Sequence, residues 1–88
     1  MFLGRVIGTV VATRKDEKLI GHKLLITQPL DLELKPKGDP IIAVDTVGAG
    51  IGELIIYVTG TAGRIAARKM DAPIDVAIVG IVDNLSLE

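Results

Sequence analysis

The chain has 88 residues, of which 49% are hydrophobic, and ten Lys and Arg residues against eleven Asp and Glu give a net charge of −1. A chain of this length builds one core, so we predict one domain over residues 1–88. The lack of cysteine excludes disulfides and thiolate zinc sites, and a single histidine, His22, excludes sites that need two. The charge balance argues against a nucleic-acid binder, and no apolar run is long enough to span a bilayer.

Four strands are predicted in the first sixty residues. Residues 3–13 alternate small and β-branched side chains, which favours a strand over a signal peptide, and Gly4 and Gly8 indicate bends or bulges in it. Residues 14–18 predict a charged turn and residues 22–30 a second strand. Residues 31–40 contain two prolines and a glycine and predict an exposed loop or a short irregular hairpin. Residues 41–47 and 53–60 predict the third and fourth strands.

The pattern changes after residue 60. Residues 61–70 predict a short helix, with Thr61 capping its first turn and Arg68 and Lys69 near its C-terminal end. Pro73 forces a new start, and residues 74–87 predict a fifth strand. Five short strands and one short helix predict a mainly β fold, a small closed five-stranded barrel.

The first and fifth predicted strands are apolar on both faces, which is typical of strands that are buried on both faces. One short helix is too little to cover the second faces, so we expect another subunit to cover them. In the fifth strand the two faces are Val76, Ile78, Gly80 and Val82 on one side, and Ala77, Val79 and Ile81 on the other.

The segment DTVGAGIGE, residues 45–53, places three glycines at alternate positions between two strands. A dinucleotide motif would need a helix directly after it and the spacing G-x-G-x-x-G, and neither is present. The segment therefore predicts a tight loop whose glycines take positive φ or allow close approach of another backbone. The alternative function, a small binding module whose glycine loop grips an anionic ligand, stays open at this point.

The other candidate residues favour structural roles. Asp45 and Glu53 flank the glycine loop without a companion base, so we expect them to accept hydrogen bonds in their own subunit or across an interface. A lone His22 indicates a surface or packing residue. Five-stranded barrels that bind oligonucleotides use stacking aromatics and a basic groove, and this chain has two aromatics. We expect no cofactor, no metal, no nucleic acid and no membrane partner.

Over essentially its whole length the sequence resembles the pentameric vertex proteins of bacterial microcompartments, shell proteins of carboxysomes and of ethanolamine-type organelles. The resemblance is carried by LGRVIGTVVATRKDEKLIGHKLLIT at 3–27, DTVGAGIGE at 45–53 and PIDVAIVGIVD at 73–83. It implies a five-stranded barrel of oligonucleotide-binding type used for assembly. Five copies would form a cyclic ring that caps a fivefold vertex of a cytoplasmic protein shell, as a structural protein and not an enzyme. Hexameric shell proteins would tile the rest of the shell.

The resemblance also assigns roles to residues. It places the glycine segment at a subunit interface or near the fivefold axis, through Asp45, Val47, Gly48, Ala49, Gly50, Gly52 and Glu53. Lys15, Lys18, Lys23 and the 31–40 loop are candidates for the rim that meets hexamers, and Arg64 is a candidate for an interface or rim contact. The chain departs from the family at GTAGR, residues 60–64, where Gly63 weakens the helix start by about 1 kcal/mol relative to alanine.

Overall fold

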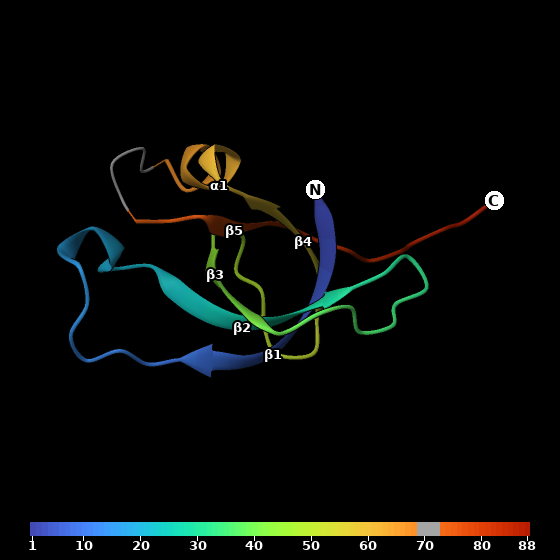
Figure 1. The fold of residues 1–88 in the computed structure, drawn as a ribbon, viewed down its shortest axis with the longest axis horizontal. Helices are drawn as coiled ribbons and strands as arrows, with labels where there is room; N and C mark the ends of the chain where they lie inside the picture. Colours follow the sequence, from blue (N-terminus) through green and yellow to red (C-terminus); the bar gives the residue numbers. More distant parts are fainter. Residues whose placement is uncertain (69–72) are drawn as a thin grey trace.

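The structure is a computed structural model, and it describes residues 1–68 and 73–88 (Figure 1). In chain order the elements are β1 (Phe2–Val10), a 3-10 turn η1 (Glu17–Leu19), β2 (Lys23–Leu30), β3 (Ile41–Asp45), β4 (Leu54–Thr59), α1 (Thr61–Ala66) and β5 (Val76–Ile81).

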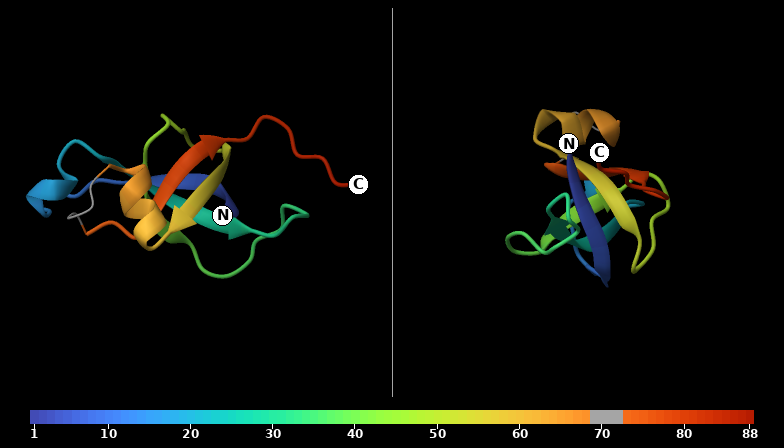
Figure 2. Two further views of the ribbon diagram at one scale, coloured as in Figure 1. Left: turned by 90° about the horizontal axis from the view of Figure 1, so that it is seen from above. Right: turned by 90° about the vertical axis from the view of Figure 1, so that its right-hand side faces the viewer.

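The five strands close into a barrel in the order β1-β2-β3-β5-β4, which Figure 2 shows from two further sides. Neighbouring strands are antiparallel except β3 and β5, which run parallel. The register of β1 against β2 shifts between Val6 and Gly8, so the bulge expected near Gly8 is present. Gly4 serves close packing instead, because a Cβ there would lie 2.7 Å from Thr27 Cγ2. The predicted mainly β, five-stranded barrel with one short helix is confirmed.

Two apolar clusters lie on opposite sides of the barrel wall, and β3 contributes to both. Alternation along this strand sends Ala43 into the barrel interior and Val44 to the outside. The outer cluster joins Val44 to Ala67 and Ile74, so the helical segment covers one part of the outer wall (Figure 1). The interior cluster consists of Val6, Leu25, Ala43, Ala49, Ile55, Tyr57 and Ile78.

The first and fifth strands are shorter than the sequence predicts. Pairing of β1 with β2 ends at Val10 opposite Leu24, three residues before the predicted end. In β5 the strand ends at Ile81, and just beyond it Val82 N–H donates to the carbonyl of Leu54 at 2.8 Å. Leu54 is the first residue of β4, so the chain beyond has no neighbouring strand to pair with. Residues 83–88 instead project from the barrel (Figure 1).

The expected cap of the helix is wrong. The N-cap is Gly60, at φ +63°, and it forms no side-chain hydrogen bond. Thr61 already lies in the first turn, where its hydroxyl accepts a bond from Arg64 Nη2 at 3.2 Å. The helix ends at Ala66, and Arg68 follows it at φ +58°. Lys69, expected near its end, lies outside the described residues.

The single chain leaves apolar side chains exposed on the outer faces of its strands. Ile7 of β1, Ile42 of β3 and Ile81 of β5 all have at least a third of their surface open to solvent. Ile7 and Ile81 belong to the first and fifth strands, whose second faces we expect another subunit to cover, and Ile42 of β3 adds to this exposed apolar surface.

Candidate functional site

The loop between β3 and β4, residues 45–53, is tied to the barrel at both of its ends and in its middle. Ala49 is fully buried and belongs to the interior cluster. Gly52 N–H donates to the carbonyl of Val6 at 2.7 Å, and Val6 N–H donates to the carbonyl of Glu53 at 3.1 Å. The loop is therefore an ordered part of the barrel and returns along the backbone of β1.

Asp45 organises the first half of this loop. Its carboxylate accepts the N–H of Val47 at 3.1 Å and the N–H of Ala49 at 2.9 Å. Lys23 Nζ lies 3.4 Å from Asp45 Oδ2 and donates to the carbonyl of Ala49 at 2.6 Å. The Asp45 side chain is 4% exposed, so this ion pair and the two backbone bonds hold a nearly buried carboxylate.

Glu53 closes the second half of the loop. Its Oε1 accepts the N–H of Gly50 at 2.6 Å, while its own N–H donates to the carbonyl of Gly50 at 3.2 Å. Arg5 Nη1 donates to the carbonyl of Gly52 at 3.0 Å from the neighbouring strand β1. The expectation that Asp45 and Glu53 act as hydrogen-bond acceptors for the loop is met within the chain itself.

The three glycines of the loop serve two purposes. Gly48 at φ +81° and Gly52 at φ +89° take the left-handed conformation that side chains disfavour. Gly50 has no positive φ, but a Cβ there would lie 3.3 Å from Glu53 Oε1. The positive φ expected from the sequence is therefore found at two glycines, and the third makes room for the carboxylate of its own loop.

The outer edge of the loop is apolar. Val47 and Ile51 are both exposed, Ile51 to 67%. Between and beside them Gly48 and Gly52 carry no side chain. A rigid loop that displays two branched apolar side chains has the character of a contact surface for another protein.

This arrangement leaves little for an anionic ligand to bind. The N–H groups of Val47, Ala49 and Gly50 already donate to Asp45 and Glu53. Those two carboxylates are negative and would repel a phosphate that approached the same backbone. Among the described residues no group of three or more His, Asp or Glu side chains is placed to hold a metal ion.

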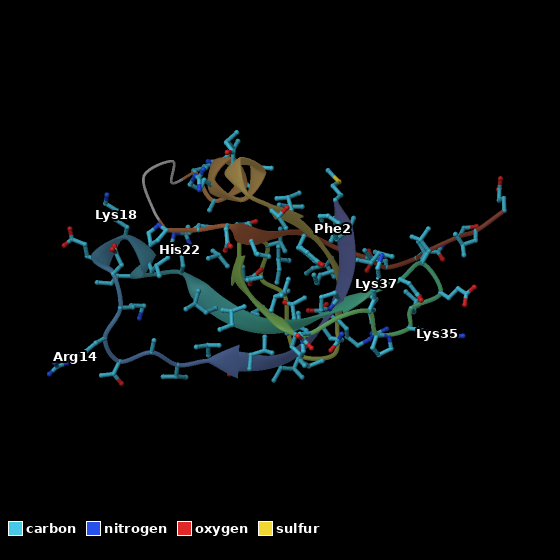
Figure 3. All side chains as sticks on the ribbon, viewed as in Figure 1. Phe2, Arg14, Lys18, His22, Lys35 and Lys37 are labelled. Atoms are coloured by element: carbon cyan, nitrogen blue, oxygen red, sulfur yellow. The ribbon has the colours of Figure 1, made fainter. Side chains whose placement is uncertain are left out.

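The remaining predicted residues lie apart from the loop. Lys15 Nζ donates to the carbonyl of Ala12 at 3.1 Å, in the connection between β1 and β2. Arg64 lies on α1 and bonds Thr61. Figure 3 shows Lys18 and His22 at one end of the molecule, and Phe2, Lys35 and Lys37 at the other.

Sequence reasoning missed two contributors to the site. Lys23, expected from the sequence at an interface or rim, also pairs with Asp45, which lies directly opposite it in the β2–β3 register, and this pairing was not predicted. Arg5 was not singled out, although a charged residue within an apolar strand is a signal that it has a partner. Both roles depend on the strand register, which cannot be read from the sequence.

In the described part of the chain, no helix is long and apolar enough to cross a membrane.

Comparison with known proteins identifies relatives over the whole chain. A family model described as "Ethanolamine utilisation protein EutN/carboxysome" matches residues 1–83. The chain is 49% identical over 85 residues to the bacterial microcompartment shell vertex protein GrpN of Rhodospirillum rubrum, covering 97% of this chain and 96% of that relative. It is 43% identical over 90 residues to the shell vertex protein PduN of Salmonella typhimurium, covering 98% and 99%.

Solved structures agree with the sequence relatives. An ethanolamine utilization protein EutN superposes with a TM-score of 0.94 at 34% identity, covering 99% of this chain and 91% of that one. The GrpN structure, described as a pentameric microcompartment shell protein from Rhodospirillum rubrum, superposes with a TM-score of 0.88 at 46% identity, covering 100% and 99%. The chain therefore belongs to the ethanolamine-utilisation EutN/carboxysome family.

Proposed function

We propose that the chain is a structural shell protein whose homopentamers cap the fivefold vertices of a bacterial microcompartment in the cytoplasm. The observation that carries this proposal is the full-length similarity to relatives named shell vertex proteins, on the same barrel. In this role the chain catalyses no reaction and needs no cofactor. Its partners are four further copies of itself and the hexameric proteins that tile the rest of the shell.

The exposed strand faces support a ring. A cyclic ring is built from head-to-tail contacts, so each subunit must offer two different surfaces to its two neighbours. Ile7, Ile42 and Ile81 come from three different strands and give the outer wall the apolar area that such contacts bury. A free monomer would leave this area in water.

The loop at residues 45–53 takes a place at the junction between subunits or near the fivefold axis. Its backbone is held by Asp45 and Glu53, so Val47 and Ile51 are presented in a fixed geometry. Lys15 and Lys18 lie outside the loop and are assigned to the rim that meets hexamers, and Arg64 to an interface or rim contact. Lys23, whose side chain is half exposed, is assigned to the rim as well as to its ion pair with Asp45.

Native mass spectrometry of the purified chain tests the ring. Five copies of 9.3 kDa give a species of about 46 kDa, as a closed cyclic assembly requires. Co-expression with a hexameric shell protein then tests the vertex role, because a net of hexagons can close into a polyhedral particle only if fivefold units fill its vertices. A folded monomer at all concentrations, or closed particles that form equally well without the chain, would refute the proposal.

A further inference from the structure

One end of the barrel carries an open hollow of about 730 Å³ with an apolar floor. The floor is a row of residues that the strand register places side by side on three neighbouring strands. Leu3 of β1 pairs with Leu30 of β2 on one side and with Ile56 of β4 on the other, and all three line the hollow. Leu32 and Leu85 line its walls.

The wall on the side of β2, residues 31–37, is held by its own hydrogen bonds. Asp31 Oδ1 accepts the N–H of Glu33 at 2.9 Å and the N–H of Lys35 at 3.0 Å. Asp31 N–H also donates to the carbonyl of Lys35 at 2.9 Å. The exposed Leu32 is therefore presented on an ordered loop, which lowers the entropy cost of any contact that it makes.

The other wall belongs to the C-terminal tail, residues 83–88, which the barrel holds only at its base. Val82 N–H donates to the carbonyl of Leu54, and beyond it residues 83–88 form no backbone hydrogen bond to any other described residue. Figure 1 shows the tail leaving the barrel at the end where the N-terminus and the connection after β2 also lie. Leu85 nevertheless lines the hollow, so a side-chain contact draws this part of the tail back to the barrel.

The sequence of the tail has the pattern of a half-buried strand. Leu85 and Leu87 alternate with Asn84, Ser86 and Glu88. Alternate residues of an extended segment lie on one face, so the tail has an apolar face and a polar face. No strand pairs with the tail, so strand pairing does not account for this pattern. A tail that turns its apolar face to the hollow does account for it.

The tail is long enough to cross the floor. It leaves the barrel beside β4, and the floor runs from β4 across β1 to β2, which is two strand spacings or about 10 Å. The chain advances five residues from Val82 to Leu87, which is about 16 Å in an extended segment. Leu87 can therefore reach the far wall, where Leu32 is 60% exposed.

We propose that residues 83–88 form a strap that closes over the hollow of its own chain, with Leu85 and Leu87 against the floor and against Leu32. The structure holds the strap half closed, because Leu85 lines the hollow while Leu87 is 63% exposed. Burial of two leucines and the ordering of a few residues involve free energies of the same order and opposite sign, so the strap opens and closes readily.

The strap is an intrachain inhibitor of binding at this surface. Any molecule that seeks the apolar floor must first displace Leu85, and its apparent affinity falls by the fraction of molecules whose strap is closed. The inference does not depend on the proposed vertex role, because it concerns one chain.

The chain contains no cysteine, so two introduced cysteines report on closure of the strap. Leu32→Cys is combined with Leu87→Cys, and the protein is oxidised under native conditions and then denatured for mass spectrometry. We expect a disulfide within one chain, because the closed strap brings the two side chains together. Arg14→Cys with Leu87→Cys is the matched control, since Arg14 lies at the opposite end of the molecule from Phe2 and Lys37 (Figure 3).

Binding of an apolar fluorescent dye, anilinonaphthalene sulfonate, measures access to the floor. We compare the double variant Leu85→Ser, Leu87→Ser with wild type, and Ser86→Ala, on the polar face of the tail, is the control. With open and closed straps equally populated, the dissociation constant of the dye should fall about twofold in the double variant and stay unchanged in the control. Loss of two leucines would by itself weaken dye binding, so tighter binding is specific to the strap.

The outcomes either support the strap or overturn it. An intrachain disulfide that forms faster than in the control, together with tighter dye binding in the double variant, supports it. A disulfide that joins two chains would place the tail over another molecule, and the strap is then overturned. The same holds if the cysteine pair reacts no faster than the control, or if the double variant binds the dye no more tightly than wild type.

Discussion

Glu53 is the residue through which the loop can be tested most directly. Its Oε1 accepts the partly buried N–H of Gly50 at 2.6 Å. The substitution Glu53→Ala removes this acceptor and leaves the N–H unsatisfied, which costs about 1–3 kcal/mol. The backbone bonds that join Glu53 to Val6 and Gly50 do not depend on the side chain, so the barrel should keep its strands.

The expected effect can be followed in melting and in assembly. A loss of about 2 kcal/mol lowers the melting temperature of a domain of this size by roughly 8–16 °C, at about 4–8 °C for each kcal/mol. In a ring every copy carries the change. If each of the five junctions is weakened by about 1 kcal/mol, the ring loses about 5 kcal/mol, or more than a thousandfold in its association constant.

Thermal denaturation followed by circular dichroism measures the first effect, and native mass spectrometry along a dilution series measures the second. Glu53→Gln is the matched control, because its amide oxygen can still accept the N–H of Gly50 and the loss should be smaller. A Glu53→Ala variant that melts like wild type and keeps the same oligomeric mass would show that the carboxylate does not hold the loop.

Three further predictions concern the barrel interior and are checked by thermal denaturation. Gly4→Ala should destabilise the fold by about 1–3 kcal/mol, because the new methyl would meet Thr27 Cγ2 at 2.7 Å and the carbonyl of Gln28 at 3.2 Å; unchanged melting would contradict this packing. Thr27→Val should stabilise by about 1–2 kcal/mol, because the buried Thr27 hydroxyl has no hydrogen-bond partner in the described part of the chain; a lower melting temperature would refute it. Burial raises the pKa of Tyr57 above its ordinary value of 10.0. Its contribution to stability is therefore complete below that pH and is lost as the pH rises through the raised pKa, so alkaline destabilisation should be smaller in Tyr57→Phe; an unchanged alkaline profile would argue against it.

The strands were predictable because alternation of apolar residues is a local signal, whereas their ends were not. β5 ends at Ile81 because its partner β4 begins at Leu54. The sequence of residues 82–87 gives no information about where β4 begins, so this end could not be predicted from it. The helix shows the same limit. Local propensity counts Gly63 against the helix, but the structure buries it, and a Cβ there would lie 3.1 Å from the backbone of Asp75. This close packing follows from tertiary structure, which propensity does not describe.

The candidate site was partly predictable for the same reason. Asp45 and Glu53 lie within a few residues of the amides they bind, so short-range reasoning finds them. Lys23 reaches the loop only through the pairing of β2 with β3. The hollow at the end of the barrel is lined by residues as far apart as Leu3 and Leu85, so no local pattern could predict it.

The backbone N–H groups of the loop at 45–53 already donate to the carboxylates of Asp45 and Glu53 in the same loop, and this favours a role in assembly over one in ligand binding. An anion that sought the N–H groups of Ala49 or Gly50 would have to displace Asp45 or Glu53, which are tethered beside those groups at high effective concentration. With its backbone satisfied, the loop offers outward chiefly the apolar surface of Ile51, and such surface gains free energy only against another apolar surface.

In the 31–37 loop, too, a carboxylate of the loop accepts hydrogen bonds from the loop's own backbone. Asp31 satisfies the N–H groups of Glu33 and Lys35, and the loop that results holds Leu32 and Leu34 at the surface. In both loops a carboxylate fixes the backbone so that apolar side chains are presented in one geometry before any partner arrives. A ring of small subunits benefits from this, because each contact that is ordered in advance lowers the entropy lost at every one of its junctions.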